Sequence, residues 1–227
     1  MDFNNKFYGS FNFLGLDIWI TQTLLGTWAI MAFLIIFALI VRSKLNSFDE
    51  VPTGGFQNFV ETCVETMDNF VTSNMGEKYS YFGNWFFGLF CFIVLSNLSG
   101  LIGMRPPTAD ITTTAAFGIS TFFLIHFMGI KERPKEYFKE YFSPHPVFFP
   151  INLVSEVAIP ISLSFRMFGN IVGGLLIMGL VYNLFPPILR IGIPAVLHIY
   201  MDVFVGALQA FIFTILSMTF IRSKIGN

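Results

Sequence analysis

The stretch at residues 155–174, SEVAIPISLSFRMFGNIVGG, decides how the rest of the chain has to be arranged. It places Arg166 in the middle of an apolar run, residues 147–184, whose only other formal charge is Glu156. A positive charge near the centre of a bilayer costs roughly 2.5–3.5 kcal/mol on insertion scales and about 10–17 kcal/mol in simulations of an isolated helix. This cost favours a functional role for Arg166 over the structural alternatives, an ion pair with Glu156 or an arginine bound by backbone carbonyls.

The composition is that of an integral membrane protein. The chain is 54% hydrophobic and 12% charged, against about 25% charged residues in an average soluble domain. Its net charge of −1 offers no general attraction for nucleic acid, so no nucleic-acid partner is expected. Cys63 and Cys91 fall in segments expected at and within the membrane, which argues against a disulfide scaffold and against a metal site.

Five apolar segments are long enough to cross a bilayer, whose hydrocarbon core is about 30 Å thick. They are residues 24–41, 82–104, 111–130, 147–183 and 186–222. The last two would each extend about 55 Å as one helix at 1.5 Å per residue, which is too long for an upright crossing. We expect them to form a long hairpin through the uncharged turn 183–187, either strongly tilted or broken near Pro160 or a glycine.

Residues 54–80 have the pattern of an amphipathic helix rather than of a crossing. Apolar residues recur there at spacings of three and four, with acidic residues between them. The acidic residues are Glu61, Glu65, Asp68 and Glu77. We expect this helix along the cytoplasmic surface or, because its polar face is acidic, against a protein partner.

The basic residues predict the orientation, because cytoplasmic segments of membrane proteins carry an excess of Lys and Arg. Most of the 13 basic residues flank the crossings on one side: Arg42, Lys44, Lys78, Lys131, Arg133, Lys135, Lys139, Arg222 and Lys224. With five crossings, the N-terminus then lies outside and the C-terminus in the cytoplasm. The predicted fold is an all-α, multi-pass integral membrane protein with a single membrane domain, residues 1–227.

Small and polar side chains surround Arg166 when its helix is drawn at 100° per residue. They include Ser155, Ser162, Gly169, Asn170 and Gly173. A face of this kind permits the close approach of another helix, or it lines a path for water or ions. Glu156 lies about 15 Å along the helix from Arg166 and about 80° around it, so the two cannot pair within one helix.

The last segment presents a second polar face, made by His198, Asp202, Gly206 and Gln209. If the two long segments form a hairpin, Gln209 lies at a depth comparable to that of Arg166. Asp202 then lies nearer the outer surface and Glu156 nearer the cytoplasm. A central positive charge with one titratable acid displaced towards each side is the layout expected of two half-channels separated by a barrier.

Two stretches carry a resemblance to a known family. PISLSFRMFGNIVGG, residues 160–174, together with GALQAFIFTILSM, residues 206–218, closely resembles subunit a of the F-type ATP synthase, of the bacterial type. The resemblance is most specific over residues 152–220 and depends on the order of the segments over residues 1–146. It implies a stator subunit beside a rotating ring of c subunits, with the two long helices steeply tilted around that ring.

The resemblance implies roles for single residues by their position. Arg166 matches the family's essential arginine, Asn170 its neighbouring asparagine, and Gln209 the glutamine that faces the arginine from the last helix. Leu175 and Asn152 stand where some members have acidic or histidine side chains, and Asp202 stands where some have a histidine. Glu156 and Asp202 are therefore the expected titratable groups of the inner and outer paths, with support from Ser155, Ser162, Gly169, Gly173, Asn152 and His198.

The implied mechanism moves ions without bond chemistry in this chain, so no catalytic residue, cofactor or metal is expected. Arg166 displaces the ion from a ring carboxylate and blocks leakage between the half-channels, which couples ion flow to rotation and ATP synthesis. The implied partners are the c-ring, the peripheral-stalk subunit b, membrane lipid and the translocated H⁺ or Na⁺, in the plasma membrane of a bacterium. The choice of ion stays open, because it should depend largely on the ring's own binding site.

Two other classes of function are weaker alternatives. A secondary transporter or channel would use the same charges for a solute, but the inverted repeat that would favour it is not found in the sequence. An intramembrane hydrolase could draw on His126, His145 and His198. No serine in a G-x-S-x-G setting and no histidine pair at zinc-site spacing accompanies them in the sequence.

Overall fold

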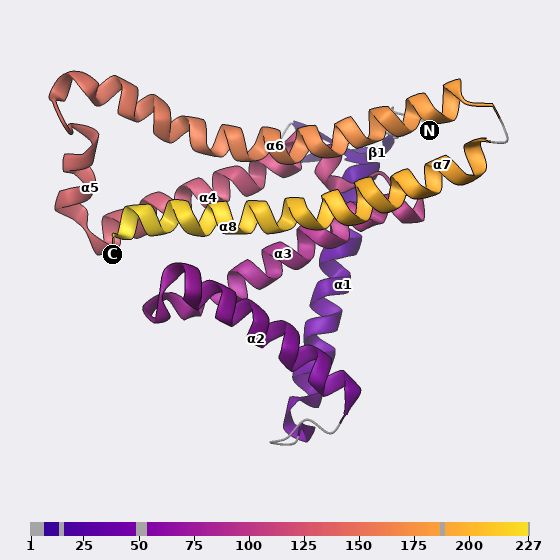
Figure 1. Ribbon diagram of the computed structural model, residues 1–227, viewed down its shortest axis with the longest axis horizontal. Coiled ribbons are helices and arrows are strands. Elements are labelled where there is room, and N and C mark those ends of the chain that lie inside the picture. The colour runs from indigo at the N-terminus through magenta and orange to yellow at the C-terminus, as the bar shows by residue number, and fades with distance from the viewer. Residues whose placement is uncertain (1–6, 14–15, 49–53, 187–188, 227) are drawn as a thin grey trace. The chain divides into compact units, whose positions relative to one another are not determined.

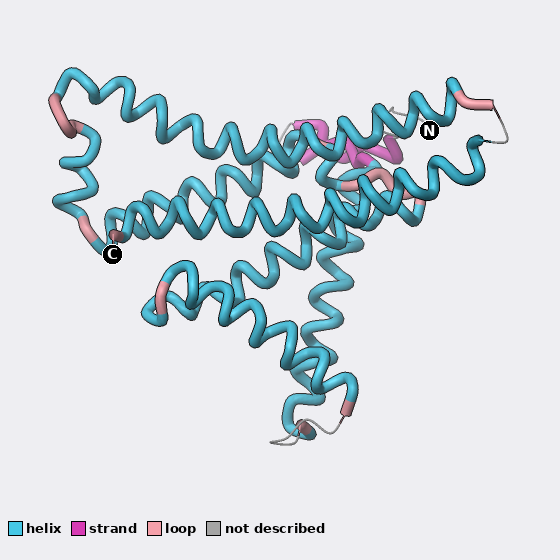
Figure 2. The backbone as a smooth tube through the Cα atoms, viewed as in Figure 1, coloured by secondary structure: helices cyan, strands magenta, loops and turns pink. Residues whose placement is uncertain are grey.

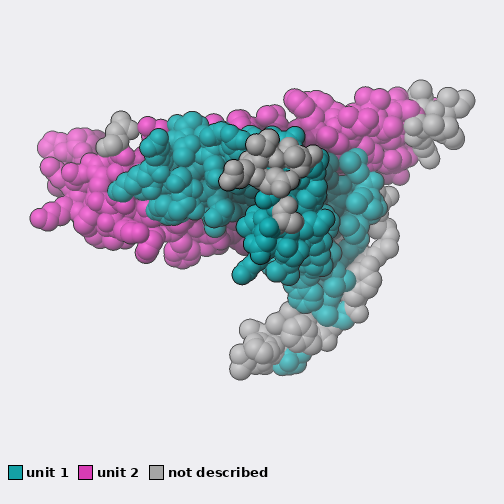
Figure 3. Space-filling view, turned by 90° about the horizontal axis from the view of Figure 1, so that it is seen from below, with its two compact units in different colours: residues 1–107 teal, residues 108–227 magenta. Residues whose placement is uncertain are grey.

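The computed structural model describes residues 7–13, 16–48, 54–186 and 189–226 (Figure 1). Figure 2 shows helices through most of this part of the chain, with one pair of short strands. The internal contacts divide the chain into two compact units, residues 1–107 and residues 108–227, which are coloured separately in Figure 3.

The first unit begins with a β-hairpin, which the sequence analysis did not predict. Strand β1 (Phe7–Phe13) pairs antiparallel with β2 (Leu16–Thr21). Helix α1 (Gln22–Lys44) follows directly. Thr21 caps this helix, because its Oγ1 accepts a hydrogen bond from the N–H of Leu24 at 3.2 Å. The predicted first crossing therefore begins at a defined cap just before residue 24.

The predicted amphipathic helix is α2 (Gly55–Met75), which follows the short turn η1 (Leu45–Ser47). Its buried apolar residues recur at helical spacing: Val60, Met67, Val71 and Met75. The helix ends before the predicted residue 80 because Gly76 follows with a positive φ of 92°, a conformation that favours glycine. An amphipathic helix is confirmed, with a shorter range.

The second predicted crossing combines three helical pieces. Helix α3 (Gly83–Leu98) lies between the 3₁₀ segments η2 (Glu77–Phe82) and η3 (Ser99–Ile102). It packs against both α1 and α2 within the first unit. The tighter 3₁₀ geometry at each end explains why the apolar range 82–104 extends beyond the α-helix itself.

The second unit contains the remaining three crossings. After the turn η4 (Pro107–Ala109), helix α4 (Ile111–Glu132) leads through α5 (Pro134–Tyr141) and η5 (Pro146–Phe148) to α6 (Phe149–Leu184). The last segment consists of α7 (Leu189–His198), the π-helical η6 (Ile199–Val205) and α8 (Gly206–Ile225). Helix α4 packs against α6 and α8, and α6 also contacts α7, η6 and α8 (Figure 1).

Helix α6 continues without a break past Pro160, so the predicted alternative of a break in this helix is wrong. The hydroxyl of Ser164 donates a hydrogen bond to the Pro160 carbonyl at 2.7 Å. Gly118 of α4 lies against both residues, and a Cβ added there would collide with them. The missing side chain at Gly118 therefore allows α4 to approach α6 closely.

The last predicted segment, residues 186–222, is not a uniform α-helix. The π-helical η6 separates α7 from α8 within one run of helical residues. Segments of π-helix are rare and occur frequently at functional sites. The turn predicted at residues 183–187 lies partly outside the described residues, which resume at 189.

Five helical segments of the described chain are long and apolar enough to cross a membrane: Gln22–Lys44, Glu77–Ile102, Ile111–Glu132, Pro146–Leu184 and Gly192–Ile225. Large apolar side chains on their outer faces stay exposed, such as Phe33 at 58% and Phe123 at 67%. Such exposure suits contact with lipid. The prediction of an all-α integral membrane protein is confirmed, and the short N-terminal β-hairpin is the one element outside that prediction among the described residues.

Candidate functional site

Arg166 lies near the middle of α6 and is exposed within this chain. It forms no hydrogen bond or ion pair with another residue of the described part of the chain. Its neighbours Phe165 and Ile161 are also open, at 59% and 51% exposure. A guanidinium on an otherwise apolar helix thus points to a face that this chain does not cover.

No other part of the described chain covers the surface around Arg166, as expected from the small residues on this helix face. A Cβ added to Gly169 or Gly173 would meet no atom of the described chain within 4 Å. Ser162 and Ser155 are exposed as well, and the Ser155 hydroxyl bonds the Ile151 carbonyl of its own helix at 3.0 Å. Room for another helix or for water therefore exists beside the arginine.

Asn170 and Gln209 form a polar link between α6 and α8, one turn along α6 from Arg166. The Asn170 Nδ2 donates to the Gln209 Oε1 at 2.6 Å, and Gln209 is only 1% exposed. The Gln209 Nε2 is buried without a hydrogen-bond partner in the described chain. Together with Arg166, these two residues are called the central site. Gln209 was predicted to face Arg166, and the bond that the structure shows goes to the residue one turn later.

A second polar pair lies where α7 meets η6. The His198 Nδ1 and the Asp202 Oδ2 are 2.6 Å apart, and both side chains are less than one-fifth exposed. Tyr182, near the end of α6, places its hydroxyl 3.5 Å from the His198 Nε2. Tyr182, His198 and Asp202 are called the histidine site. The imidazole can donate to the carboxylate from Nδ1 and accept from the phenol at Nε2.

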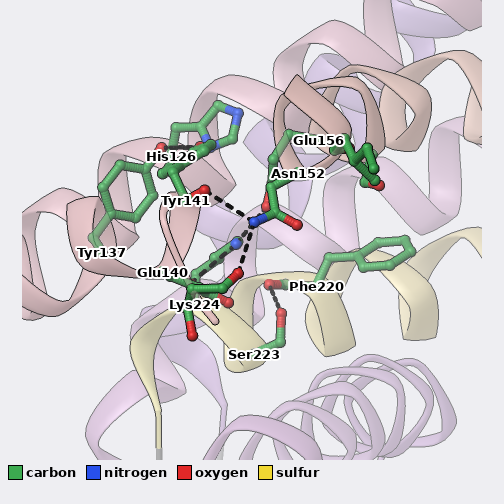
Figure 4. Close-up of polar contacts among 12 residues, drawn as sticks. His126, Tyr137, Glu140, Tyr141, Asn152, Glu156, Phe220, Ser223 and Lys224 are labelled. Carbon is green, nitrogen blue, oxygen red and sulfur yellow. Dashed lines mark hydrogen bonds and ion pairs between the residues drawn. The ribbon is translucent and has the colours of Figure 1, made fainter. Parts of the chain in front are cut away.

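The third polar group lies at the other end of α6, around Lys224 of α8 (Figure 4). The Lys224 ammonium pairs with Glu156 of α6 and with Glu140 of α5, whose Oε2 is 3.2 Å away. It also lies 5.7 Å from the ring centre of Tyr141, within the range of a cation–π contact. Lys224, Glu156, Glu140 and Tyr141 are called the Lys224 cluster.

Hydrogen bonds hold α5 against α4 and α6 next to this cluster. Tyr137 places its hydroxyl 3.0 Å from the His126 Nδ1 of α4 and 2.7 Å from the Tyr141 hydroxyl. The Asn152 Nδ2 of α6 donates to the carbonyls of Tyr141 and Ser143, at 2.9 and 3.0 Å. Burial, followed by the hydrogen bond from Tyr137, raises the pKa of the Tyr141 phenol above its ordinary value. The Tyr141 phenol therefore stays neutral.

The three polar groups follow one another along α6. At 1.5 Å per residue, Glu156 lies about 15 Å from Arg166 towards the start of the helix, and Tyr182 lies about 24 Å from Arg166 towards its end. Each group is completed by a residue of the last segment: Lys224, Gln209 and His198 in turn. No three His, Cys, Asp or Glu side chains within the described ranges are placed to hold a metal ion.

Comparison with known proteins decides the family. The model of the family described as ATP synthase A chain matches residues 24–222. The chain belongs to this family. ATP synthase subunit a 2 of Syntrophotalea carbinolica is 36% identical over 209 residues, 90% of this chain and 86% of the relative. ATP synthase subunit a of Moorella thermoacetica is 34% identical over 206 residues, 90% of each chain.

A third relative carries an ion in its name. ATP synthase subunit a, sodium ion specific, of Propionigenium modestum is 33% identical over 227 residues, 92% of this chain and 75% of the relative. Membership of the ATP synthase subunit a family, with five membrane-crossing candidates, makes this chain a multi-pass membrane protein of ATP synthesis and ion transport.

The sequence analysis selected some of the residues that the structure brings together and left others out. It selected Asn170 and Gln209 separately, the latter opposite Arg166, and it placed His198 and Asp202 on one face; the structure joins each of these two pairs by a hydrogen bond. It predicted no direct partner for Glu156, which pairs with Lys224. It also left Tyr182, Tyr137, Tyr141 and Glu140 out. The helix α5 could have been found, because Pro134 at its first position followed by KEYFKEY is a helix-start signal.

Proposed function

We propose that this chain is the stator subunit that passes ions between two half-channels and a rotating ring of c subunits. The observation that carries the proposal is the exposed, unpaired Arg166 on an open face of α6, flanked along that helix by the Lys224 cluster and the histidine site. Charged side chains within membrane-spanning segments usually pair with one another or with backbone carbonyls. The absence of such a partner among the described residues fits a partner that another subunit brings.

The partner in this proposal is a ring carboxylate. An opposite charge within about 4–6 Å favours the ionised form of a carboxylate, so a ring site arriving at Arg166 releases its ion. The positive charge of the guanidinium also repels cations that would leak from one path to the other. Asn170 and Gln209, bonded to each other beside Arg166, hold the two long helices together at this depth.

The outer path in the proposal runs past the histidine site and the inner path past Glu156. His198 and Asp202 offer adjacent groups that exchange protons, and Asp202 alone offers a carboxylate for a metal cation. The positive-inside rule places the C-terminus in the cytoplasm and the N-terminus outside. Each elementary charge that crosses about 100 mV then supplies about 2.3 kcal/mol to rotation.

The remaining assignments concern partners and the ion. The uncovered face of α6 supports a ring of c subunits as its partner, and the acidic side of α2 supports the peripheral-stalk subunit b or another protein. We propose that both compact units act as one membrane domain, residues 1–227, in a bacterial plasma membrane. H⁺ and Na⁺ both remain candidates, and the sodium-specific relative shows that this family contains a Na⁺ member.

Replacing Arg166 tests the proposal. We expect Arg166→Ala, in the assembled complex in membrane vesicles, to abolish ATP-driven ion transport while subunit assembly is retained. The matched control is Arg133→Ala, which removes an arginine that pairs with Glu136 on the surface. Normal ATP-driven transport by Arg166→Ala would refute the proposal. Solute or ion transport by the purified chain alone would favour a secondary transporter or channel instead.

A further inference from the structure

The Lys224 cluster contains more negative than positive charge. One ammonium serves two carboxylates, and the Glu156 Oε2 is buried without a hydrogen-bond partner in the described chain. Buried carboxylate oxygens normally have partners, and an unsatisfied one needs an explanation. The Glu156 carboxylate therefore has acceptor capacity left, although its other oxygen holds the Lys224 ammonium.

The two carboxylates lie in different surroundings. The side chain of Glu156 is 13% exposed, whereas that of Glu140 is 56% exposed and stands on the short helix α5. Lys224 reaches both from the last turn of α8, where its own side chain is 8% exposed. A lysine has a compact charge on a flexible four-carbon stem, so its ammonium can exchange between neighbouring acceptors.

Space for this exchange exists beside the cluster. A pocket of about 150 Å³ is lined by Lys224, Glu140, Tyr137 and Ser223, together with Arg133 and Glu136. This is room for several water molecules, since one occupies about 30 Å³ in the liquid. An ammonium that turns from Glu156 towards Glu140 thus stays solvated.

We propose that Lys224 is a tethered competitor for the inner ion path: its ammonium, which contacts both carboxylates, leaves Glu156 and stays on Glu140 alone when the translocated cation takes its place on Glu156. The inference deepens the proposed function, because it assumes that Glu156 belongs to that path. Lys224 is a positioning residue that acts through Glu156. Whether the translocated cation is H⁺ or Na⁺, one cation replaces another at Glu156, so the net charge at this carboxylate stays constant.

The competition has a measurable consequence. A site that is free for only a fraction of the time binds its ligand with an apparent Kd equal to the intrinsic Kd divided by that fraction, so about 10% availability weakens binding about tenfold. Lys224→Met removes the competitor and should lower the cation concentration for half-maximal transport, up to about tenfold. Glu140→Gln removes the alternative acceptor and should raise it. If the ion pair were merely structural, the two variants would not shift the half-maximal concentration in opposite directions.

The test uses the assembled complex in inverted vesicles, with ATP and the cytoplasmic side facing the medium. Initial transport rates are measured over a Na⁺ series at fixed pH and over a pH series at low Na⁺. In the pH series the groups that interact with Glu156 are His126 of α4, Tyr141 of α5 and Lys224 of α8, and Glu140 of α5 shares the Lys224 ammonium with it. His126→Gln therefore serves as a background in which the pH series is repeated.

Controls on the same helix isolate the effect. Lys139→Met removes an exposed lysine next to Glu140, and Glu136→Gln removes an exposed carboxylate that lines the same pocket. Both should leave the half-maximal concentration unchanged. If Lys224→Met does not assemble, Glu140→Gln decides alone, because its exposed side chain can be neutralised without loss of the fold.

The inference is overturned if Glu140→Gln leaves the half-maximal concentration unchanged, or if both variants shift it in the same direction. With Arg166→Ala still inactive, that result would leave the proposed function intact. Normal transport by Arg166→Ala would instead refute the proposed function itself.

Discussion

Arg166 and Lys224 both lie on long apolar helices of the second unit, and their surroundings differ. Arg166 is exposed on α6 and has no partner among the described residues. Lys224 is buried on α8 and is bound by two carboxylates and a tyrosine ring. Both side chains carry a charge that lipid alone does not solvate. The chain satisfies Lys224 by itself and leaves Arg166 to be satisfied from outside.

The difference separates a charge that serves the fold from one that needs another subunit. Leaving a buried charge unpaired is strongly unfavourable, so Lys224 and Glu156 stabilise each other across α8 and α6. Arg166 instead lies beside glycines that leave an empty surface. The position of each charge therefore predicts what its removal should do to stability.

The largest effect on stability is expected at the Lys224 cluster. Lys224→Met leaves the Glu156 carboxylate buried without its partner and should lower the free energy of unfolding by about 3–5 kcal/mol. Arg166→Ala should change it by less than about 0.5 kcal/mol, as is usual for exposed positions. Denaturant unfolding of the purified subunit in detergent measures both. The double variant Lys224→Met with Glu156→Gln should recover most of the lost stability. Equal losses of unfolding free energy in Lys224→Met and Arg166→Ala would contradict the distinction between the two charges.

A smaller effect distinguishes two glycines at different faces of α6: Gly118 of α4, which packs against one face, and Gly169 of α6, which lies on the open face. Gly118→Ala places a methyl group against Pro160 and Ser164 and should destabilise the subunit by about 1–3 kcal/mol through overpacking. Gly169→Ala meets empty space and should leave the stability of the isolated subunit unchanged. In the assembled complex the same Gly169→Ala should slow ATP-driven transport, because a neighbouring subunit approaches there. Unchanged transport would indicate that lipid, not a subunit, covers this face.

Much of this fold could be predicted because lipid imposes simple rules on sequence. The five crossings follow from uninterrupted apolar runs, and α2 follows from its apolar spacing. Arg166 was selected because a charge in such a run is conspicuous, and Asn170 because it shares a helix face with Arg166 and matches the family resemblance. Gln209 and Asp202 were selected for their shared polar face on the last segment, and each has a hydrogen bond to another residue of the site.

What could not be predicted depends on tertiary structure. The pair of Lys224 and Glu156 requires that the last turn of α8 lie beside the first turns of α6, and no local pattern specifies this. The π-helical η6 likewise has no signal in residues 199–205 that distinguishes it from an α-helix. The continuity of α6 past Pro160 was left open, because proline usually ends or kinks a helix.

The central claim is that the face of α6 around Arg166 is covered by another subunit, and site-specific photo-crosslinking tests it most directly. A photo-reactive amino acid replaces Ser162, which is exposed one turn before Arg166, or Ser164, which is buried against Gly118 of α4. In the assembled complex, the account predicts a covalent product with a ring subunit from position 162 and only intramolecular products from position 164. Products with lipid alone from position 162 would contradict it.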